Sequence, residues 1–92
     1  MDEKLGKGLQ ALYASDLAKA EEQFNKIIKN DPLNAEAYFY RGKTHWQNGN
    51  LTAAMSDFSK TLSINPLHNQ ATVSLEMVKN IMGFRNPDLL NP

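Results

Sequence analysis

Apolar residues recur along the chain at the spacing of amphipathic helices. In the segment 17–29, Ala20, Phe24, Ile27 and Ile28 are separated by one to four positions. This period places their side chains on one face of an α-helix. Similar spacing recurs through the rest of the chain, and the pattern predicts helices over residues 2–14, 17–29, 35–48, 51–63 and 69–82.

Polar and proline-containing turns separate these segments. Asp16 and Asn50 precede the second and fourth helices and suit the N-cap position, while Gly49 suits a helix end. The stretches "DPLN" at 31–34 and "NPLH" at 65–68 each follow a predicted helix. Because proline and the residue before it disfavour helix continuation, both stretches are predicted to be turns.

When the sequence is aligned with itself so that "DPLN" lies on "NPLH", residues of the same kind fall on one another at several other positions. The matched pairs are Gly8 and Gly42, Leu17 and Leu51, Ala20 and Ala54, Phe24 and Phe58, Ile28 and Leu62, and Pro32 and Pro66. Glycine within a helix costs about 1 kcal/mol relative to alanine, so its repetition predicts a close approach of two helices. We expect Ala20 and Ala54 to face the glycines. We expect Phe24 and Phe58 to fill the space between units.

A helix-turn-helix unit with this repeat length and these matched positions resembles the tetratricopeptide repeat, or TPR. The resemblance covers two repeats, 1–34 and 35–68, of which the second matches better. The first departs from the family pattern, since Lys4 occupies an early aromatic position and Ala11 a position usually held by tyrosine. The resemblance implies an all-α fold, a TPR-type alpha-alpha superhelix of two helix-turn-helix repeats plus one C-terminal capping helix. The alternative is an unrelated array of helical hairpins.

The segment 69–82 begins like a third repeat but lacks the internal glycine and a second helix. One stripe of this segment is apolar and can close the preceding repeat: Ala71, Leu75, Val78 and Met82. The positions where a following helix would pack are polar: Thr72, Glu76 and Lys79. We interpret 69–82 as a solvating capping helix within a single domain, 1–83, followed by a C-terminal tail, 84–92. The initial methionine and this cap favour a complete small protein.

Charge and composition exclude several functions. The 92 residues include ten basic and ten acidic side chains, whose charges cancel. The chain therefore lacks the net positive charge that favours binding to nucleic acid or to an anionic membrane surface. No cysteine is present for a disulfide, a thiolate metal ligand or a nucleophile. The polar start resembles no secretory signal, and no apolar run approaches the roughly 20 residues that span a membrane. A cytoplasmic location is therefore expected.

The sequence contains no convincing catalytic, cofactor or metal site. The segment 37–44, "AYFYRGKT", satisfies a relaxed phosphate-loop pattern, but it lies in a predicted helix and lacks the glycine-rich turn that the function needs. His45 and His68 are far apart in sequence and lack a carboxylate cluster at ligand spacing. No serine has an identifiable base nearby. We therefore predict a protein that is not an enzyme and binds no cofactor or metal.

In TPR proteins the first helix of each repeat lines a concave surface that binds peptides or other proteins. The resemblance implies that this surface is lined by Leu5, Leu9, Leu12, Tyr13, Phe39, Lys43, Trp46, Gln47, Val73, Met77, Asn80 and Ile81. Because the lining is mostly apolar, the expected partner is a protein or peptide with an apolar segment. Phe39 and Trp46 would be its anchors. The same two aromatics can equally be TPR residues that pack between adjacent helices.

A second TPR binding mode is disfavoured. Some TPR proteins grip the C-terminal carboxylate of heat-shock chaperones with a clamp of lysines, asparagines and an arginine. The five clamp positions would be held here by Leu5, Leu9, Tyr40, Gln70 and Ser74. None of these is a clamp residue, so the sequence argues against a partner of that kind.

Two alternatives to peptide binding stay open. Two copies of the chain could associate through the same surface, burying Leu5, Leu9, Trp46 and Met77 in a homodimer. Alternatively, Phe84, Leu89 and Leu90 of the tail could fold back over the helices. The chain would then be a self-contained structural module.

Overall fold

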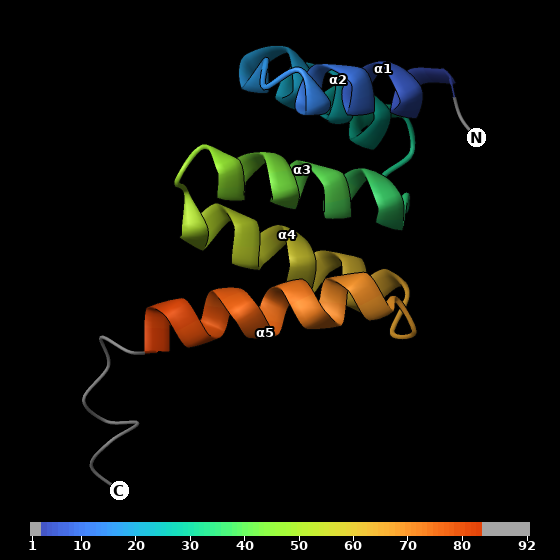
Figure 1. The fold of residues 1–92 in the computed structure, drawn as a ribbon. Coiled ribbons are helices and arrows are strands. Elements are labelled where there is room, and N and C mark those ends of the chain that lie inside the picture. The colour runs from blue at the N-terminus through green and yellow to red at the C-terminus, as the bar shows by residue number, and fades with distance from the viewer. Residues whose placement is uncertain (1–2, 84–92) are drawn as a thin grey trace, which may run out of the picture.

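Five α-helices follow one another through the part of the chain that the computed structural model describes, residues 3–83 (Figure 1). They are α1 (Glu3–Tyr13), α2 (Leu17–Asn30), α3 (Ala35–Gln47), α4 (Leu51–Ile64) and α5 (Asn69–Gly83). Each helix begins and ends within one residue of its predicted bound. The predictions for 84–92, including the folding back of Phe84, Leu89 and Leu90, lie outside the described residues.

Side-chain caps explain why the helices begin where they do. In three turns, an oxygen of the residue before the helix accepts a hydrogen bond from the backbone N–H three residues later. These pairs are Asp16 with Lys19 at 3.3 Å, Asn34 with Ala37 at 3.1 Å, and Asn50 with Ala53 at 3.1 Å. Gly49 lies in the α3–α4 turn, just after the end of α3, at a φ of 80°, a conformation that glycine adopts at little cost. The predicted cap positions are therefore confirmed.

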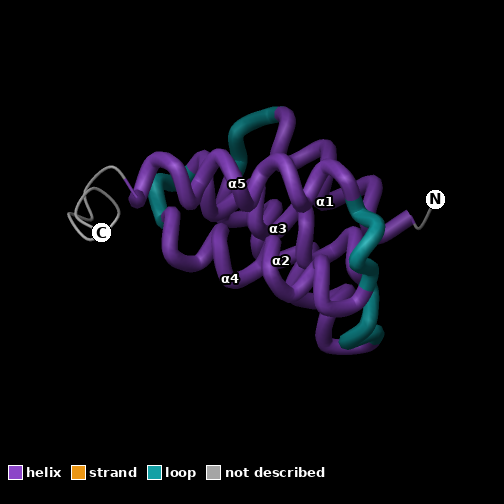
Figure 2. The backbone as a smooth tube through the Cα atoms, turned by 90° about the horizontal axis from the view of Figure 1, so that it is seen from below, coloured by secondary structure: helices purple, strands orange, loops and turns teal. Residues whose placement is uncertain are grey.

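Neighbouring helices in the chain are also neighbours in space. α1 packs on α2, α2 on α3, α3 on α4, and α4 on α5 (Figure 1). In the view from below, α1, α3 and α5 lie toward one side and α2 and α4 toward the other (Figure 2). This two-layer stack of helical hairpins confirms the predicted all-α repeat architecture.

Two apolar clusters form the core of the stack. The first joins α1 and α2 to the start of α3 and contains Leu5, Leu9, Ala11, Leu12, Ala20, Phe24, Ile27 and Ala37. The second joins α3, α4 and α5 and contains Phe39, Ala54, Phe58, Ala71, Leu75 and Val78. Tyr40 packs against both clusters, so the apolar contacts continue from one repeat to the next.

The repeated glycines lie against phenylalanine rings. A Cβ placed on Gly8 would lie 2.4 Å from the ring of Phe24, and one on Gly42 would lie 2.7 Å from the ring of Phe58. Both phenylalanines are fully buried. We expected the paired alanines to be the facing residues, and this was wrong, because the atoms nearest the glycines belong to the rings. Each glycine makes room for an aromatic side chain.

Replacing Gly8 with alanine should test this contact. The new methyl group would force Phe24 to move, at a cost of about 1 to 3 kcal/mol that exceeds the helix-propensity gain of up to about 1 kcal/mol. We expect urea denaturation to show a lower free energy of unfolding. Gly6→Ala is the matched control, since nothing lies within 4 Å of a Cβ at Gly6 and the change should be neutral or stabilising. Equal effects of the two substitutions would argue against the contact.

An ion pair inside the stack connects α3 to α4. Nε and Nη2 of Arg41 donate hydrogen bonds to the two carboxylate oxygens of Asp57, each at 2.8 Å. Nη1 of Arg41 donates to Oδ1 of Asn25 on α2 at 3.0 Å. The hydrogen bond to Asp57 raises the pKa of Arg41. His45, whose Nε2 lies 3.6 Å from Oδ2 of Asp57, belongs to the same group, which ties three helices together.

Candidate functional site

A hollow of about 300 Å³ lies between α3 and α5, and we call it the α3–α5 groove. It is lined by Phe39, Lys43, Asn69, Gln70, Val73 and Ser74. Phe39 is itself 2% exposed, and Nζ of Lys43 lies 5.7 Å from the centroid of its ring. The lining thus combines apolar side chains with amide groups and one positive charge.

The repeat explains which side chains are open to a partner. Leu5, Phe39 and Val73 hold the same position in three successive units. Their exposed fractions are 7%, 2% and 58%. The first two pack into the two core clusters, whereas no described helix follows α5 to cover the third. Exposed large apolar side chains are therefore found on α5, as well as at Tyr13, Leu33 and Leu67.

The structure separates the predicted lining residues into three groups. Exposed side chains belong to Tyr13, Gln47, Val73, Met77, Asn80 and Ile81. Half-buried side chains belong to Lys43 and Trp46. The buried side chains belong to Leu5, Leu9, Leu12 and Phe39.

This grouping corrects one part of the sequence-based expectation. Leu5, Leu9 and Leu12 pack against α2 and the start of α3 within the first core cluster, so they offer little surface to a partner. They therefore form no continuous exposed patch with Val73 and Met77. The resemblance on which the lining rests could not show how far neighbouring helices cover each of these side chains.

Phe39 and Trp46 contribute to packing between helices. The ring of Phe39 lies 5.7 Å from that of Phe58 and 4.7 Å from that of His68, measured between centroids. Trp46 meets Phe58 edge to face at 6.2 Å. The alternative interpretation of these aromatics as packing residues thus fits their contacts. Phe39 in addition lines the α3–α5 groove.

One flank of α5 carries an exposed apolar strip. Val73, Met77 and Ile81 follow one another at every fourth position and are 58%, 50% and 38% exposed. The other flank of α5 is exposed and polar, as predicted, with Thr72, Glu76 and Lys79. The helix therefore closes the core with one face and presents two chemically different flanks.

Sequence reasoning did not predict the role of His68. Nδ1 of this histidine accepts a hydrogen bond from the backbone N–H of Ala71 at 3.0 Å, so the side chain caps α5. Nε2 lies 2.5 Å from Oε1 of Glu36. Asn34, the equivalent residue of the preceding proline turn, caps α3 in the same way. A direct comparison of the two turns would have revealed the cap.

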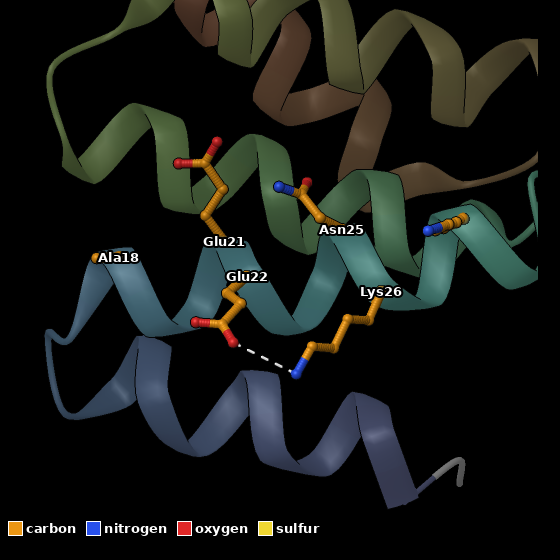
Figure 3. Close-up of a pocket in the computed structure, with 6 residues that line it drawn as sticks. Ala18, Glu21, Glu22, Asn25 and Lys26 are labelled. Atoms are coloured by element: carbon orange, nitrogen blue, oxygen red, sulfur yellow. Dashed lines mark ion pairs between the residues drawn. The ribbon is translucent and has the colours of Figure 1, made fainter.

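A second hollow, of about 400 Å³, lies on α2, and most of the side chains that line it carry charged or amide groups (Figure 3). Its lining includes Glu21, Asn25 and an exposed ion pair in which Nζ of Lys26 lies 3.3 Å from Oε1 of Glu22. Exposed pairs of this kind contribute little to stability.

Metal-binding clusters and membrane-spanning helices are both absent from residues 3–83. Within that range, no group of three or more histidine, cysteine, aspartate or glutamate side chains is arranged to hold a metal ion. None of the helices in the described part of the chain has the length and apolar character needed to cross a bilayer.

Comparison with known proteins gives consistent matches. A family model described as tetratricopeptide repeat matches residues 5–69. Tetratricopeptide repeat protein 16 of Macaca fascicularis is 32% identical over 73 residues, which are 79% of this chain and 8% of that protein. The NADPH oxidase activator of Dictyostelium discoideum is 30% identical over 56 residues, or 61% of this chain and 9% of that protein. The chain thus spans less than a tenth of the length of either relative.

Proposed function

Because the chain belongs to the tetratricopeptide repeat family, we propose that it is a non-enzymatic protein-interaction module that binds an apolar peptide segment or helix in the α3–α5 groove. Repeats of this family generally mediate contacts between proteins. The observation that carries the finer proposal is the exposed strip of Val73, Met77 and Ile81 beside that groove. A cytoplasmic location stays a prediction.

The chemistry of the lining supports an apolar ligand with polar contacts. Covering exposed apolar side chains contributes roughly 25 cal/mol per Å², and Val73 and Met77 are at least half exposed. The side-chain amides of Asn69 and Gln70 can donate to and accept from a peptide backbone. Lys43 adds a positive charge beside Phe39, so we expect an acidic residue next to the apolar anchor of the ligand.

The same positions disfavour a chaperone carboxylate as the ligand. Of the five positions of the family's clamp, Leu5 and Leu9 are buried, and Tyr40, Gln70 and Ser74 carry no positive charge. A terminal carboxylate would therefore lack the cations that bind it in a clamp. We propose an internal apolar segment as the ligand instead.

Val73→Asp should weaken peptide binding by about ten-fold or more, because it would place a carboxylate against the apolar part of the ligand. The measurement is a fluorescence-anisotropy titration with a peptide selected on the wild-type protein from a random library. Thr72→Asp is the matched control, since Thr72 is also exposed but lies on the polar flank of α5. Unchanged affinity in Val73→Asp would exclude this groove as the binding site.

Alanine substitutions of the aromatics are less suitable as tests. Phe39 is 2% exposed, and Trp46 packs against Phe58. Their removal would reduce the stability of the fold as well as any binding. The exposed position Val73 separates the two effects.

A second copy of the chain is the alternative ligand for the strip. Val73, Met77 and Ile81 are spaced symmetrically about Met77, so two α5 helices could pair antiparallel. Leu5 and Leu9, which we expected in such a dimer, are buried and would not contribute. Sedimentation across a dilution series decides the matter, since a monomer at all concentrations excludes the dimer.

A further inference from the structure

His68 lies at the junction between the second repeat and α5, where three groups surround it. Its side chain is 7% exposed. Glu36 of α3 approaches Nε2, the N–H of Ala71 approaches Nδ1, and the ring of Phe39 packs beside the imidazole. Glu36, whose side chain is 46% exposed, is the charged group in contact with it. Every hydrogen-bonding position of the ring is therefore occupied.

The contacts determine where the ring carries its proton. Nδ1 accepts the N–H of Ala71 and must present its lone pair, so the proton of the neutral ring is on Nε2. That N–H donates to the carboxylate of Glu36. A histidine in this state caps the helix as an asparagine would. Unlike asparagine, it can lose its accepting nitrogen by gaining a proton.

We propose that His68 is an acid-sensitive cap, whose protonation releases the first turn of α5 beside the α3–α5 groove. A proton on Nδ1 would face the N–H of Ala71, so two hydrogen-bond donors would point at each other. The two nitrogens are 3.0 Å apart in the present arrangement. The positive end of the helix dipole also disfavours a cation at this place. The charged ring can instead keep its bond to Glu36, which becomes charge-assisted. The cap is then lost while the link to α3 persists.

The position of the cap connects protonation to the groove. Asn69 and Gln70 follow His68 directly and line the groove, as does Phe39. A loosened first turn would therefore change the groove wall and lower its affinity for a peptide. This consequence rests on the proposed function, whereas the cap itself does not.

Nuclear magnetic resonance of the free protein tests the cap without any ligand. A long-range ¹H–¹⁵N spectrum at pH 7.5 should show the ring proton of His68 on Nε2. Between pH 7.5 and 5.0, the amide of Ala71 should lose about five-fold in protection from hydrogen exchange, after correction for intrinsic rates. The amide of Ala37, capped by Asn34, should not change.

His68→Asn provides the matched variant, since asparagine caps α3 at the equivalent position. In this variant the protection of Ala71 should be independent of pH. The proposal is overturned if the ring proton is on Nδ1 at pH 7.5. It is equally overturned if Ala71 in the wild type stays protected down to pH 5.0, or if both proteins show the same loss. Because no peptide is used, a failure to bind peptides would leave these outcomes unaffected.

Discussion

Replacing Phe58 with alanine is expected to lower the free energy of unfolding by about 3 to 5 kcal/mol. The Phe58 side chain is fully buried at the centre of the second core cluster. Its ring covers Gly42 and packs against Phe39 and Trp46, with centroid distances of 5.7 and 6.2 Å. Alanine would leave a cavity that these rigid neighbours cannot fill.

Urea denaturation at neutral pH measures this loss. Small domains are stable by about 5 to 15 kcal/mol, so Phe58→Ala removes a large part of the total. Leu67→Ala is the control, because Leu67 is 84% exposed in a turn and its replacement should cost less than about 0.5 kcal/mol. A loss below about 1 kcal/mol in Phe58→Ala would contradict this packing of the second core cluster.

Arg41→Leu is expected to cost about 3 to 5 kcal/mol at pH 7, because it leaves the Asp57 carboxylate buried without its main partner. That carboxylate is 6% exposed and accepts two hydrogen bonds from Arg41, each at 2.8 Å. His45 is the other cationic candidate, and its Nε2 lies 3.6 Å from the carboxylate. That longer contact would replace only part of the interaction.

The double variant Arg41→Leu with Asp57→Leu tests whether the stability lost in Arg41→Leu comes from the unpaired Asp57 carboxylate. Replacing both members of a buried ion pair with apolar residues is often neutral, so most of the stability lost in the single variant should return. Urea denaturation of all four proteins of the cycle gives the coupling free energy. A single variant within about 1 kcal/mol of wild type, or a double variant less stable than either single one, would show that the ion pair does not act in this way.

The helices were predictable because their signals are local. Caps such as Asp16 and Asn50, together with the proline turns, set each helix bound to within one residue. The regular offset between matched residues likewise indicated the stack of hairpins. In contrast, the contact of Gly8 with Phe24 depends on how two helices approach each other. Spacing along one helix does not contain that information.

The groove was predictable only in part, for the same reason. Periodicity places Leu5 and Val73 at equivalent positions, but burial depends on the element that follows each of them in the stack. The pairing of His68 with Glu36 joins the two ends of the second repeat, 32 positions apart in sequence, and neither residue carries a recognisable motif. Such contacts arise from the packing of one helix against another. The exposed apolar strip on α5 is the part of the site on which the functional proposal depends.

Mapping a selected peptide onto the ¹⁵N-labelled protein by chemical-shift perturbation tests the proposed binding surface most directly. We predict that the amides of Lys43, Val73 and Met77 shift most, together with their neighbours on α3 and α5. The exposed amides of α2, including Glu22 and Lys26, should stay unchanged. Largest shifts on α2 or α4 at saturating peptide would contradict the claim that the α3–α5 groove is the binding surface.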